Sequence, residues 1–210
     1  MARSKTSHAW MREHITDPFV KRARKEGYRS RAAYKLTEIV ERDRLIRPGM
    51  TVVELGAAPG GWCQFVSTLV GPKGRVVALD LLEMAPIPGV TFIRGDFRED
   101  APRQALEQAL GGRQADLVLS DMAPNISGVA ATDQARAAEL AELALAFAER
   151  HLKPGGSVLV KAFHGAGIDE VRRRMAAAFE TVSVRKPRAS RDRSSEFYLL
   201  ARGRRGQSGR

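Results

Sequence analysis

Several features that would direct this 210-residue chain to other classes of protein are scarce. It has one cysteine, Cys63, which excludes an internal disulfide and a metal site built from several cysteines. No apolar run approaches the roughly 20 residues that a membrane-spanning helix needs. The polar, basic N-terminus lacks the apolar core of a secretory signal. We therefore expect a cytoplasmic protein with no metal site and no role at a membrane.

Charge is distributed unevenly along the chain. Residues 1–50 hold 13 Lys and Arg against 6 Asp and Glu, and residues 183–210 hold 9 against 2, so each segment carries +7. Residues 51–182 carry −3, which leaves +11 in total. Two basic segments around a mildly acidic centre predict a polyanionic partner such as a nucleic acid. The alternative is that both segments are solvated tails.

Strand-like and helical segments alternate from residue 51 onward. Apolar, β-branched runs predict strands at 51–55, 75–79, 90–93, 115–120, 157–160, 181–185 and 197–201. Helical spacing predicts helices at 17–25, 31–44, 62–70, 101–110, 130–152 and 168–179. This alternation predicts an α/β fold, a mostly parallel sheet with helices on both faces. The last two strands should pair antiparallel, because the loop 186–195 is too short for a crossover helix.

The sequence indicates one domain, from residue 15 to 202. Its first part, 15–48, is a helical extension that precedes the first strand, and Ser30 is the expected N-cap of the second helix. The basic N-terminus 1–14 and the basic tail 203–210 are expected to be disordered.

The stretch from Thr51 to Trp62, TVVELGAAPGGW, combines a strand, a glycine-rich turn and the start of a helix. Such a unit binds nucleotides, since glycines allow close approach of the backbone and the helix N-terminus offers free N–H groups. The spacing is G-x-x-x-G-G, whereas NAD-binding proteins have G-x-G-x-x-G. The turn therefore favours another adenosine-containing ligand.

Three aspartates and a lysine follow predicted strands, at the sheet edge where α/β proteins bind ligands. Asp80 lies where an acidic group would accept hydrogen bonds from ribose hydroxyls, or it is a turn aspartate. Asp96 would receive an adenine amino group or belongs to a plain turn. Asp121 follows the fourth strand. Lys161 ends a buried strand, where partial desolvation favours the neutral form that a base requires, although strand-end lysines often reach solvent instead.

Five motifs together resemble the FtsJ/RrmJ-type ribose 2′-O-methyltransferases, and specifically the bacterial group of ribosomal RNA large subunit methyltransferase E. They are SRAAYKL at 30–36, ELGAAPGGW at 54–62, SDMAPN at 120–125, VK at 160–161 and SSEFY at 194–198. The resemblance covers residues 15–202. It implies a Rossmann-like class I methyltransferase fold with a seven-stranded sheet and an antiparallel last strand.

The resemblance also implies a cofactor, S-adenosyl-L-methionine, bound at the glycine-rich turn. The residues expected to contact it are Gly56, Pro59, Gly60, Gly61, Trp62, Asp80, Asp96 and Asp121. Asp80 would lie at its ribose, Asp96 at its adenine, and Asp121 beside the methionine part and the methyl group.

The family uses a Lys-Asp-Lys-Glu tetrad, which matches Lys35, Asp121, Lys161 and Glu196 here. Lys161 would be the general base that removes the proton from a ribose 2′-hydroxyl. A positive charge on Lys35 would help to keep Lys161 neutral, while the two carboxylates orient the lysines. A carboxylate too close to a lysine would act in the opposite sense, and the sequence leaves this balance open.

The basic segments would hold RNA phosphates beside the reacting ribose. Their residues are Arg22, Arg24, Lys25, Arg29 and Arg31 in the first, and Arg185, Lys186, Arg188, Arg191 and Arg193 in the second. The resemblance implies a uridine in the aminoacyl-tRNA-binding loop of 23S rRNA, on the large ribosomal subunit, and a monomeric enzyme without an obligate protein partner. The alternatives are a ribose methyltransferase for tRNA or an mRNA cap, and a non-catalytic RNA-binding assembly factor.

Two positions depart from the family pattern. Cys63 stands where serine is common, and its place near a helix start favours a somewhat acidic thiol. We interpret it as a tolerated substitution and not as a nucleophile. His164 replaces the usual glutamine and is expected to lie in a turn.

Overall fold

The computed structural model describes residues 16–165, 167–191 and 194–206. The disorder expected for residues 1–14, and for 207–210 of the tail 203–210, concerns residues outside these ranges, whereas Gly203 and Arg204 of that tail belong to a strand. Within them, no helix is long and apolar enough to cross a membrane. The last strand extends to Arg204, two residues beyond the predicted end of the domain.

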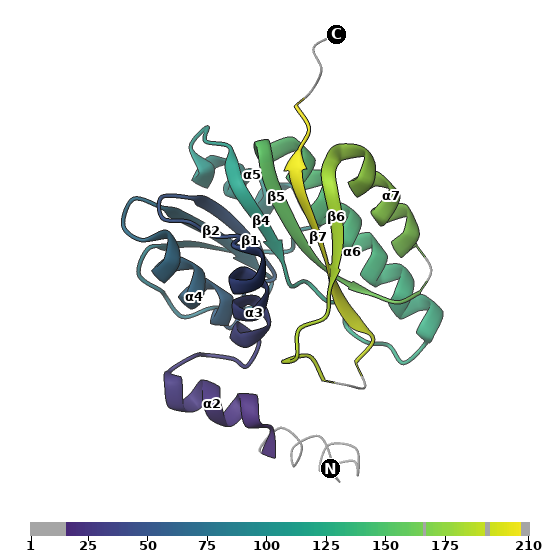
Figure 1. The fold of residues 1–210 in the computed structure, drawn as a ribbon, viewed down its shortest axis with the longest axis horizontal. Helices are drawn as coiled ribbons and strands as arrows, with labels where there is room; N and C mark the ends of the chain where they lie inside the picture. Colours follow the sequence, from purple (N-terminus) through teal and green to yellow (C-terminus); the bar gives the residue numbers. More distant parts are fainter. Residues whose placement is uncertain (1–15, 166, 192–193, 207–210) are drawn as a thin grey trace.

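Seven strands form a single mixed sheet in the order β3-β2-β1-β4-β5-β7-β6 (Figure 1). The strands are β1 (Thr51–Leu55), β2 (Arg75–Asp80), β3 (Val90–Arg94), β4 (Ala115–Ser120), β5 (Leu152–Phe163), β6 (Phe179–Arg185) and β7 (Glu196–Arg204). Strands β1 to β5 pair parallel, whereas β7 lies between β5 and β6 and is antiparallel to both. The predicted fold class and the antiparallel last pair are confirmed.

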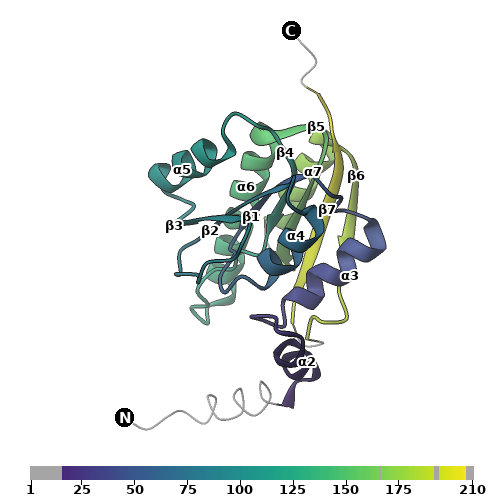
Figure 2. The ribbon, with the colours of Figure 1, turned by 90° about the vertical axis from the view of Figure 1, so that its left-hand side faces the viewer.

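Helices cover both faces of the sheet (Figure 2). The covering helices are α3 (Ala33–Asp43), α4 (Gly61–Val70), α5 (Asp100–Leu110), α6 (Ala130–His151) and α7 (Ile168–Ala178), while α2 (Pro18–Glu26) lies away from the sheet. Successive side chains of a strand point to opposite faces of the sheet, so the core has two parts, one on each face. Val53 and Leu55 of β1 pack with residues of α5, α6 and α7, while Val52 packs with α3 and α4.

The helical extension begins as the sequence predicts and then departs from it. Asp17 caps α2 by accepting a hydrogen bond from Phe19 N at 2.9 Å, and Pro18 occupies the first turn. The expected cap at Ser30 is wrong, because α3 begins at Ala33 and no side chain caps it. Instead, the carbonyl of Ser30 accepts from Ala33 N at 3.3 Å in a tight turn.

One edge of the sheet gathers the chemically interesting side chains. The carboxyl ends of β1, β2, β4 and β5 meet there because these strands are parallel neighbours. Strand β7 runs the other way, so its first residues reach the same edge. The register pairs Lys161 of β5 with Tyr198, and Phe163 with Glu196.

Candidate active site

The glycine-rich turn after β1 is shaped by how closely other segments approach it. Gly56 has φ +79°, and a Cβ there would lie 2.7 Å from Met122 N. Gly60 has φ +101°, and its Cβ would lie 2.7 Å from Ile87 Cδ1. Both positions therefore require glycine for its conformation and for its lack of a side chain.

The turn also packs against the helical extension. A Cβ on Gly61 would lie 2.5 Å from Ser30 Oγ. The indole of Trp62 is buried and donates to Ala32 O at 2.7 Å, so its side chain faces the extension and only its backbone lies along the turn. The carbonyl of Pro59 accepts from Arg29 at 3.3 Å.

Asp80 and Asp96 follow neighbouring strands beside this turn. Asp80 joins the turn to the next loop, since its carboxylate accepts from Ala58 N at 2.8 Å and from Leu82 N at 2.7 Å. Asp96 forms an ion pair with Arg98 at 2.6 Å and accepts from its backbone N–H. These hydrogen bonds hold the pKa of Asp96 below its usual range.

Glu54 lies under the turn as a fully buried carboxyl group. Burial raises its pKa to about 8, and the nearby charges of Asp121 and Asp80 act in the same sense. The Cys63 thiol hydrogen-bonds to this carboxyl, while Oε2 has no partner among the described residues. Glu54 opens the motif and Cys63 directly follows it, but nothing in the sequence indicated that they would pair in the interior.

The residues around the turn fit an adenosine-containing methyl donor. Gly56 and Gly60 let Met122 and Ile87 pack directly against the turn, which keeps its backbone open to a ligand on the other side, and the strand-end aspartates offer acceptors for hydroxyl and amino groups. Glu54 Oε2, which has no hydrogen-bond partner among the described residues, adds an unused acceptor below the turn.

Lys161 and Asp121 form the first of two partly buried ion pairs. Lys161 Nζ lies 2.9 Å from Asp121 Oδ1 and also donates to Asp121 O at 2.9 Å. The two side chains are 9% and 18% exposed. The backbone N–H of Asp121 donates to Leu55 O at 2.9 Å, which fixes this pair beside the glycine-rich turn.

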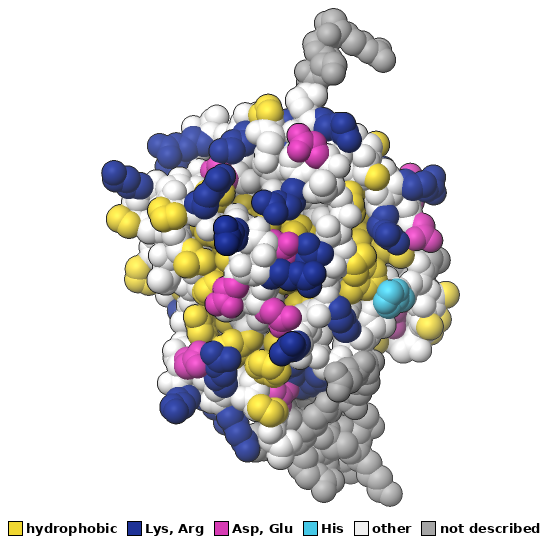
Figure 3. All heavy atoms as spheres, in the orientation of Figure 1, with side chains coloured by type: hydrophobic (Ala, Val, Ile, Leu, Met, Phe, Trp, Pro, Cys, Tyr) yellow, Lys and Arg dark blue, Asp and Glu magenta, His cyan; other side chains and the backbone are white. Residues whose placement is uncertain are grey.

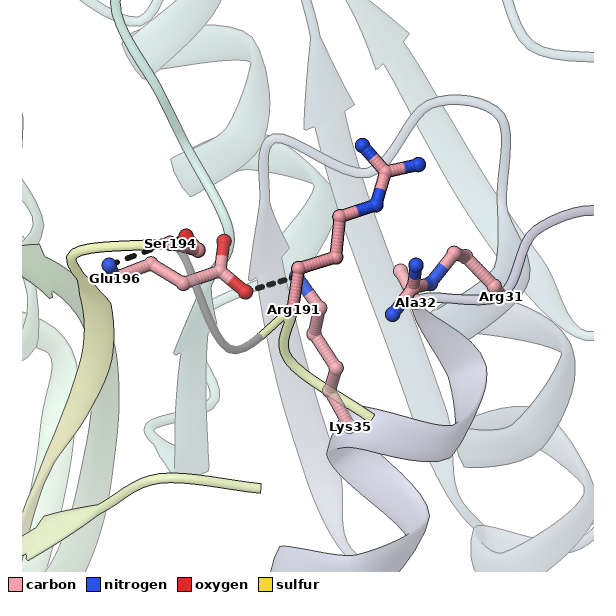
Figure 4. Close-up of a pocket in the computed structure, with 6 residues that line it drawn as sticks. All are labelled: Arg31, Ala32, Lys35, Arg191, Ser194 and Glu196. Carbon is pink, nitrogen blue, oxygen red and sulfur yellow. Dashed lines mark hydrogen bonds and ion pairs between the residues drawn. The ribbon is translucent and has the colours of Figure 1, made fainter. Parts of the chain in front are cut away.

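Lys35 and Glu196 form the second pair, at 2.5 Å. Lys35 comes from α3, which packs on one face of the sheet, and its side chain points toward Glu196 at the start of β7 (Figure 4). Burial would raise the pKa of Glu196, but the charge of Lys35 and its hydrogen bond, helped by Lys161, hold that pKa below its usual value. The structure thus brings all four tetrad positions together.

Tyr198 connects β7 to the first ion pair, and sequence reasoning gave it no role. Its hydroxyl donates to Asp121 Oδ1 at 2.8 Å, and its ring is fully buried beside Trp62. Burial and the Asp121 charge raise the pKa of Tyr198 well above its usual value, so it remains a donor. The only sequence signal was its position two residues after Glu196.

A cavity of about 460 Å³ opens beside Lys35 and Glu196. Its lining residues, drawn in Figure 4, are Arg31, Ala32, Lys35, Arg191, Ser194 and Glu196. Three of the six are cationic, and they come from both basic segments. The arrangement suits a polyanionic ligand brought next to the lysine pairs.

Many of the basic residues proposed to hold phosphates are engaged within the protein. Arg31 contacts Asp17 and Ala189 O, and Arg185 forms a two-pronged ion pair with Asp43 at 2.6 and 2.7 Å. Lys186 donates to Ser194 O and Glu196 O, Arg22 pairs with Glu26, and Arg29 contacts the turn. Exposed side chains include those of Arg24, Lys25 and Arg188, whereas Arg193 lies outside the described residues.

Lys and Arg side chains are spread widely over the face of the molecule that Figure 3 displays, with Asp and Glu among them. The basic segments therefore have two roles in the structure. Some arginines join parts of the fold, and the exposed remainder is available to a polyanion.

Neither departure from the family pattern adds a reactive group. The acidic thiol expected at Cys63 is wrong, because burial and the neighbouring Glu54 raise its pKa. His164 stacks on Phe197 with ring centroids 4.5 Å apart, just after β5. Among the described residues, no group of three or more His, Cys, Asp or Glu is placed to hold a metal ion.

Comparison with known proteins identifies close relatives over the whole chain. The model of the FtsJ-like methyltransferase family matches residues 28–204. A protein named ribosomal RNA large subunit methyltransferase E from Pseudomonas fluorescens is 61% identical, over 99% of this chain and 100% of its own. One of the same name from Azoarcus sp. is 63% identical, over 95% and 98%.

Solved structures agree with this fold. A ribosomal RNA methyltransferase from Plasmodium falciparum superposes with a TM-score of 0.75 at 28% identity, over 86% of this chain and 100% of its own. A methyltransferase from Streptococcus mutans, solved in complex with SAH, has a TM-score of 0.52 at 14% identity, over 76% and 90%. The second likeness concerns the fold alone.

Proposed function

Because the chain belongs to the FtsJ-like methyltransferase family, we propose that it transfers a methyl group from S-adenosylmethionine to a ribose 2′-hydroxyl of ribosomal RNA. The observation that carries the proposal is the pair of partly buried lysine–carboxylate contacts next to the glycine-rich turn. A donor pocket and a candidate base then share one edge of the sheet. The names of the relatives favour rRNA of the large subunit over tRNA or an mRNA cap.

Lys161 is the proposed general base. A bound donor supplies a methyl group on a positively charged sulfur, and the 2′-oxygen attacks that carbon as its proton leaves. To act as the base, Lys161 must first lose the proton that its ion pair with Asp121 favours. Nζ then keeps two N–H groups, and Asp121 offers acceptors for both, one on the carbonyl and one on the carboxylate. The lone pair is then directed away from Asp121, toward a position where a hydroxyl proton can be received.

The other tetrad members position this base and the acceptor. Asp121 is held in turn by the Tyr198 hydroxyl and by its own N–H, so the lysine has a fixed acceptor. Lys35, paired with Glu196, lines the cavity beside the base. We infer that this cavity receives the RNA, with Lys35 facing the sugar–phosphate backbone of the target nucleotide.

Donor contacts are assigned to the other end of the same edge. We propose that Gly56, Gly60 and Gly61, with the backbone of Pro59 and Trp62, lie against the donor. Asp80 would meet its ribose, Asp96 its adenine, and Asp121 its methionine part. The glycine geometry and the strand-end carboxylates support this assignment.

The proposed target is a uridine in the aminoacyl-tRNA-binding loop of 23S rRNA, modified on the large subunit by a monomeric, cytoplasmic enzyme of one domain. Labelled methyl transfer to purified large subunits, small subunits, tRNA and capped transcripts tests this. We expect label at one uridine 2′-oxygen of large-subunit rRNA. Label in tRNA or in a cap instead would show that the proposed substrate is wrong. No label in any RNA would favour a non-catalytic assembly factor.

A further inference from the structure

Arg29 is placed where the helical extension meets the proposed donor pocket, and its guanidinium contacts two segments at once. Its guanidinium donates to Ala85 O at 2.6 Å, Pro86 O at 2.9 Å and Pro59 O at 3.3 Å. Pro59 belongs to the glycine-rich turn, and the other two belong to the loop 81–89 that follows Asp80. A residue expected to hold phosphate thus uses its donors on the protein backbone.

The extension is bound to α4, the helix that follows the same turn, at both ends of its connecting segment. We call residues 27–32 the strap, since they join α2 to α3. Gln64 of α4 holds its start, accepting from Arg29 N at 2.8 Å and donating to Gly27 O at 3.1 Å. Trp62 donates to Ala32 O at 2.7 Å at its end.

The loop 81–89 closes over the turn from the other side. Its Met84 and Ile87 are buried against Ala57 and Cys63. Arg29 Nη1 lies 3.1 Å from the position that a Gly60 Cβ would take, so the guanidinium packs against the turn at Gly60. Arg29 therefore fixes the spacing between the turn and the loop that carry the proposed donor contacts.

We propose that Arg29 is a positioning residue that couples donor binding to RNA binding through the strap. The inference rests on the proposed function for the location of the donor. Lys35 and the cavity-lining Arg31 lie within six residues of Arg29. A donor bound between the glycine-rich turn and the loop 81–89 favours the backbone arrangement that the hydrogen bonds of Arg29 stabilise. The strap is then held in place, and it positions Arg31 and Lys35 for RNA binding. Such coupling must be reciprocal.

The test compares Arg29→Met with Arg24→Met, an exposed arginine of the same extension. Calorimetry measures S-adenosylhomocysteine binding, and filter binding measures affinity for a 23S rRNA transcript with and without that ligand. For wild type we expect each ligand to tighten the other by at least about fivefold. Arg29→Met should weaken S-adenosylhomocysteine binding about tenfold and reduce the coupling to within twofold of none.

Arg24→Met should instead weaken RNA binding and leave both donor affinity and coupling unchanged. A purely structural role for Arg29 would lower the unfolding temperature and both affinities together while preserving the coupling, and that result would overturn the proposal. Unchanged donor affinity in a folded Arg29→Met protein would overturn it as well. If wild type binds S-adenosylhomocysteine but methylates no RNA, the proposed function fails while the donor measurement still decides the role of Arg29. If wild type does not bind it, both proposals fail.

Discussion

The donor side and the acceptor side of the candidate site are built by different means. On the donor side, a short continuous motif supplies glycines whose missing side chains let Met122 and Ile87 pack against the turn, and the turn's Ala58 N–H donates to Asp80. On the acceptor side, Lys35 and Glu196 are 161 positions apart and meet as a partly buried ion pair. One side depends on shape, and the other depends on paired charges.

The first consequence concerns the acceptor side, where one side chain carries the chemistry. Lys161→Ala should reduce kcat by about 10³-fold, because general base catalysis contributes roughly 10²- to 10⁴-fold. Binding of S-adenosylhomocysteine should remain within about threefold of wild type, since Lys161 is not among the donor contacts. Single-turnover methylation and calorimetry measure the two effects.

The exposed Lys73, after α4, supplies a matched control. Lys73→Ala should retain wild-type turnover. If Lys161→Ala keeps more than a tenth of the wild-type rate, Lys161 is not the base.

On the donor side, adding one methyl group should suffice to damage the site. Gly56→Ala would place a Cβ 2.7 Å from the backbone N of Met122, the residue after Asp121, and would strain a φ of +79°. We expect the affinity for S-adenosylhomocysteine to fall at least about tenfold, equal to 1.4 kcal/mol. Calorimetry provides the measurement.

Gly112→Ala is the comparison, because Gly112 has φ +76° and its Cβ would meet nothing within 4 Å. It has the backbone strain without the clash and should leave donor affinity unchanged. Equal losses of affinity in both variants would show that backbone strain, and not space at the turn, limits binding.

The two sides should also respond oppositely to pH. The pKa of Glu54 is raised to about 8, so the folded state favours its protonated form. Its contribution to stability is complete below the unfolded pKa, about 4.5, and is lost as pH rises through about 8. Glu54→Gln should therefore gain roughly 1–2 kcal/mol of unfolding free energy relative to wild type between pH 6 and 8.

For Glu196 the sign is reversed. Its pKa is held below 4.5, so its contribution is present above that value and is lost as pH falls through the lower, folded pKa. Glu196→Gln should lose stability at pH 7 and approach wild type in acid. Urea unfolding of both variants from pH 3 to 9 measures these trends, and parallel curves would contradict the assigned shifts.

The smallest effect is expected from the exposed cations. Neutralising Arg24 and Lys25 together should weaken RNA binding severalfold and flatten its dependence on salt concentration by up to about 2 in the logarithmic slope. Donor affinity should not change. Filter binding between roughly 50 and 200 mM salt measures the slope. An unchanged slope would show that this segment is a solvated tail.

The sequence predicts the site residues at the ends of parallel strands better than those that α3 and β7 contribute, for a physical reason. Strand-end rules place Asp80, Asp121 and Lys161 at one edge, because parallel strands bring their ends together. Lys35 and Glu196 followed only from a family resemblance, since an ion pair between such distant positions depends on how α3 folds over β7.

Contacts that depend on packing were missed. The charge of Arg29 and Arg31 is visible in the sequence, but their carbonyl partners within the protein are not. The pairing of Glu54 with Cys63 and the contact from Tyr198 to Asp121 likewise required the coordinates. The helix start at Ala33 shows how a backbone turn can replace an expected side-chain cap.

The insertion of β7 between β5 and β6 has a consequence for the order of folding. Strand β7 is synthesised last and lies between β5 and β6. Until β7 pairs with them, β5 and β6 each keep an open hydrogen-bonding edge. That last strand also brings Glu196 and Tyr198. A truncated or half-folded chain would therefore be inactive and prone to aggregation at the same time, and active molecules would be those whose sheet is already closed.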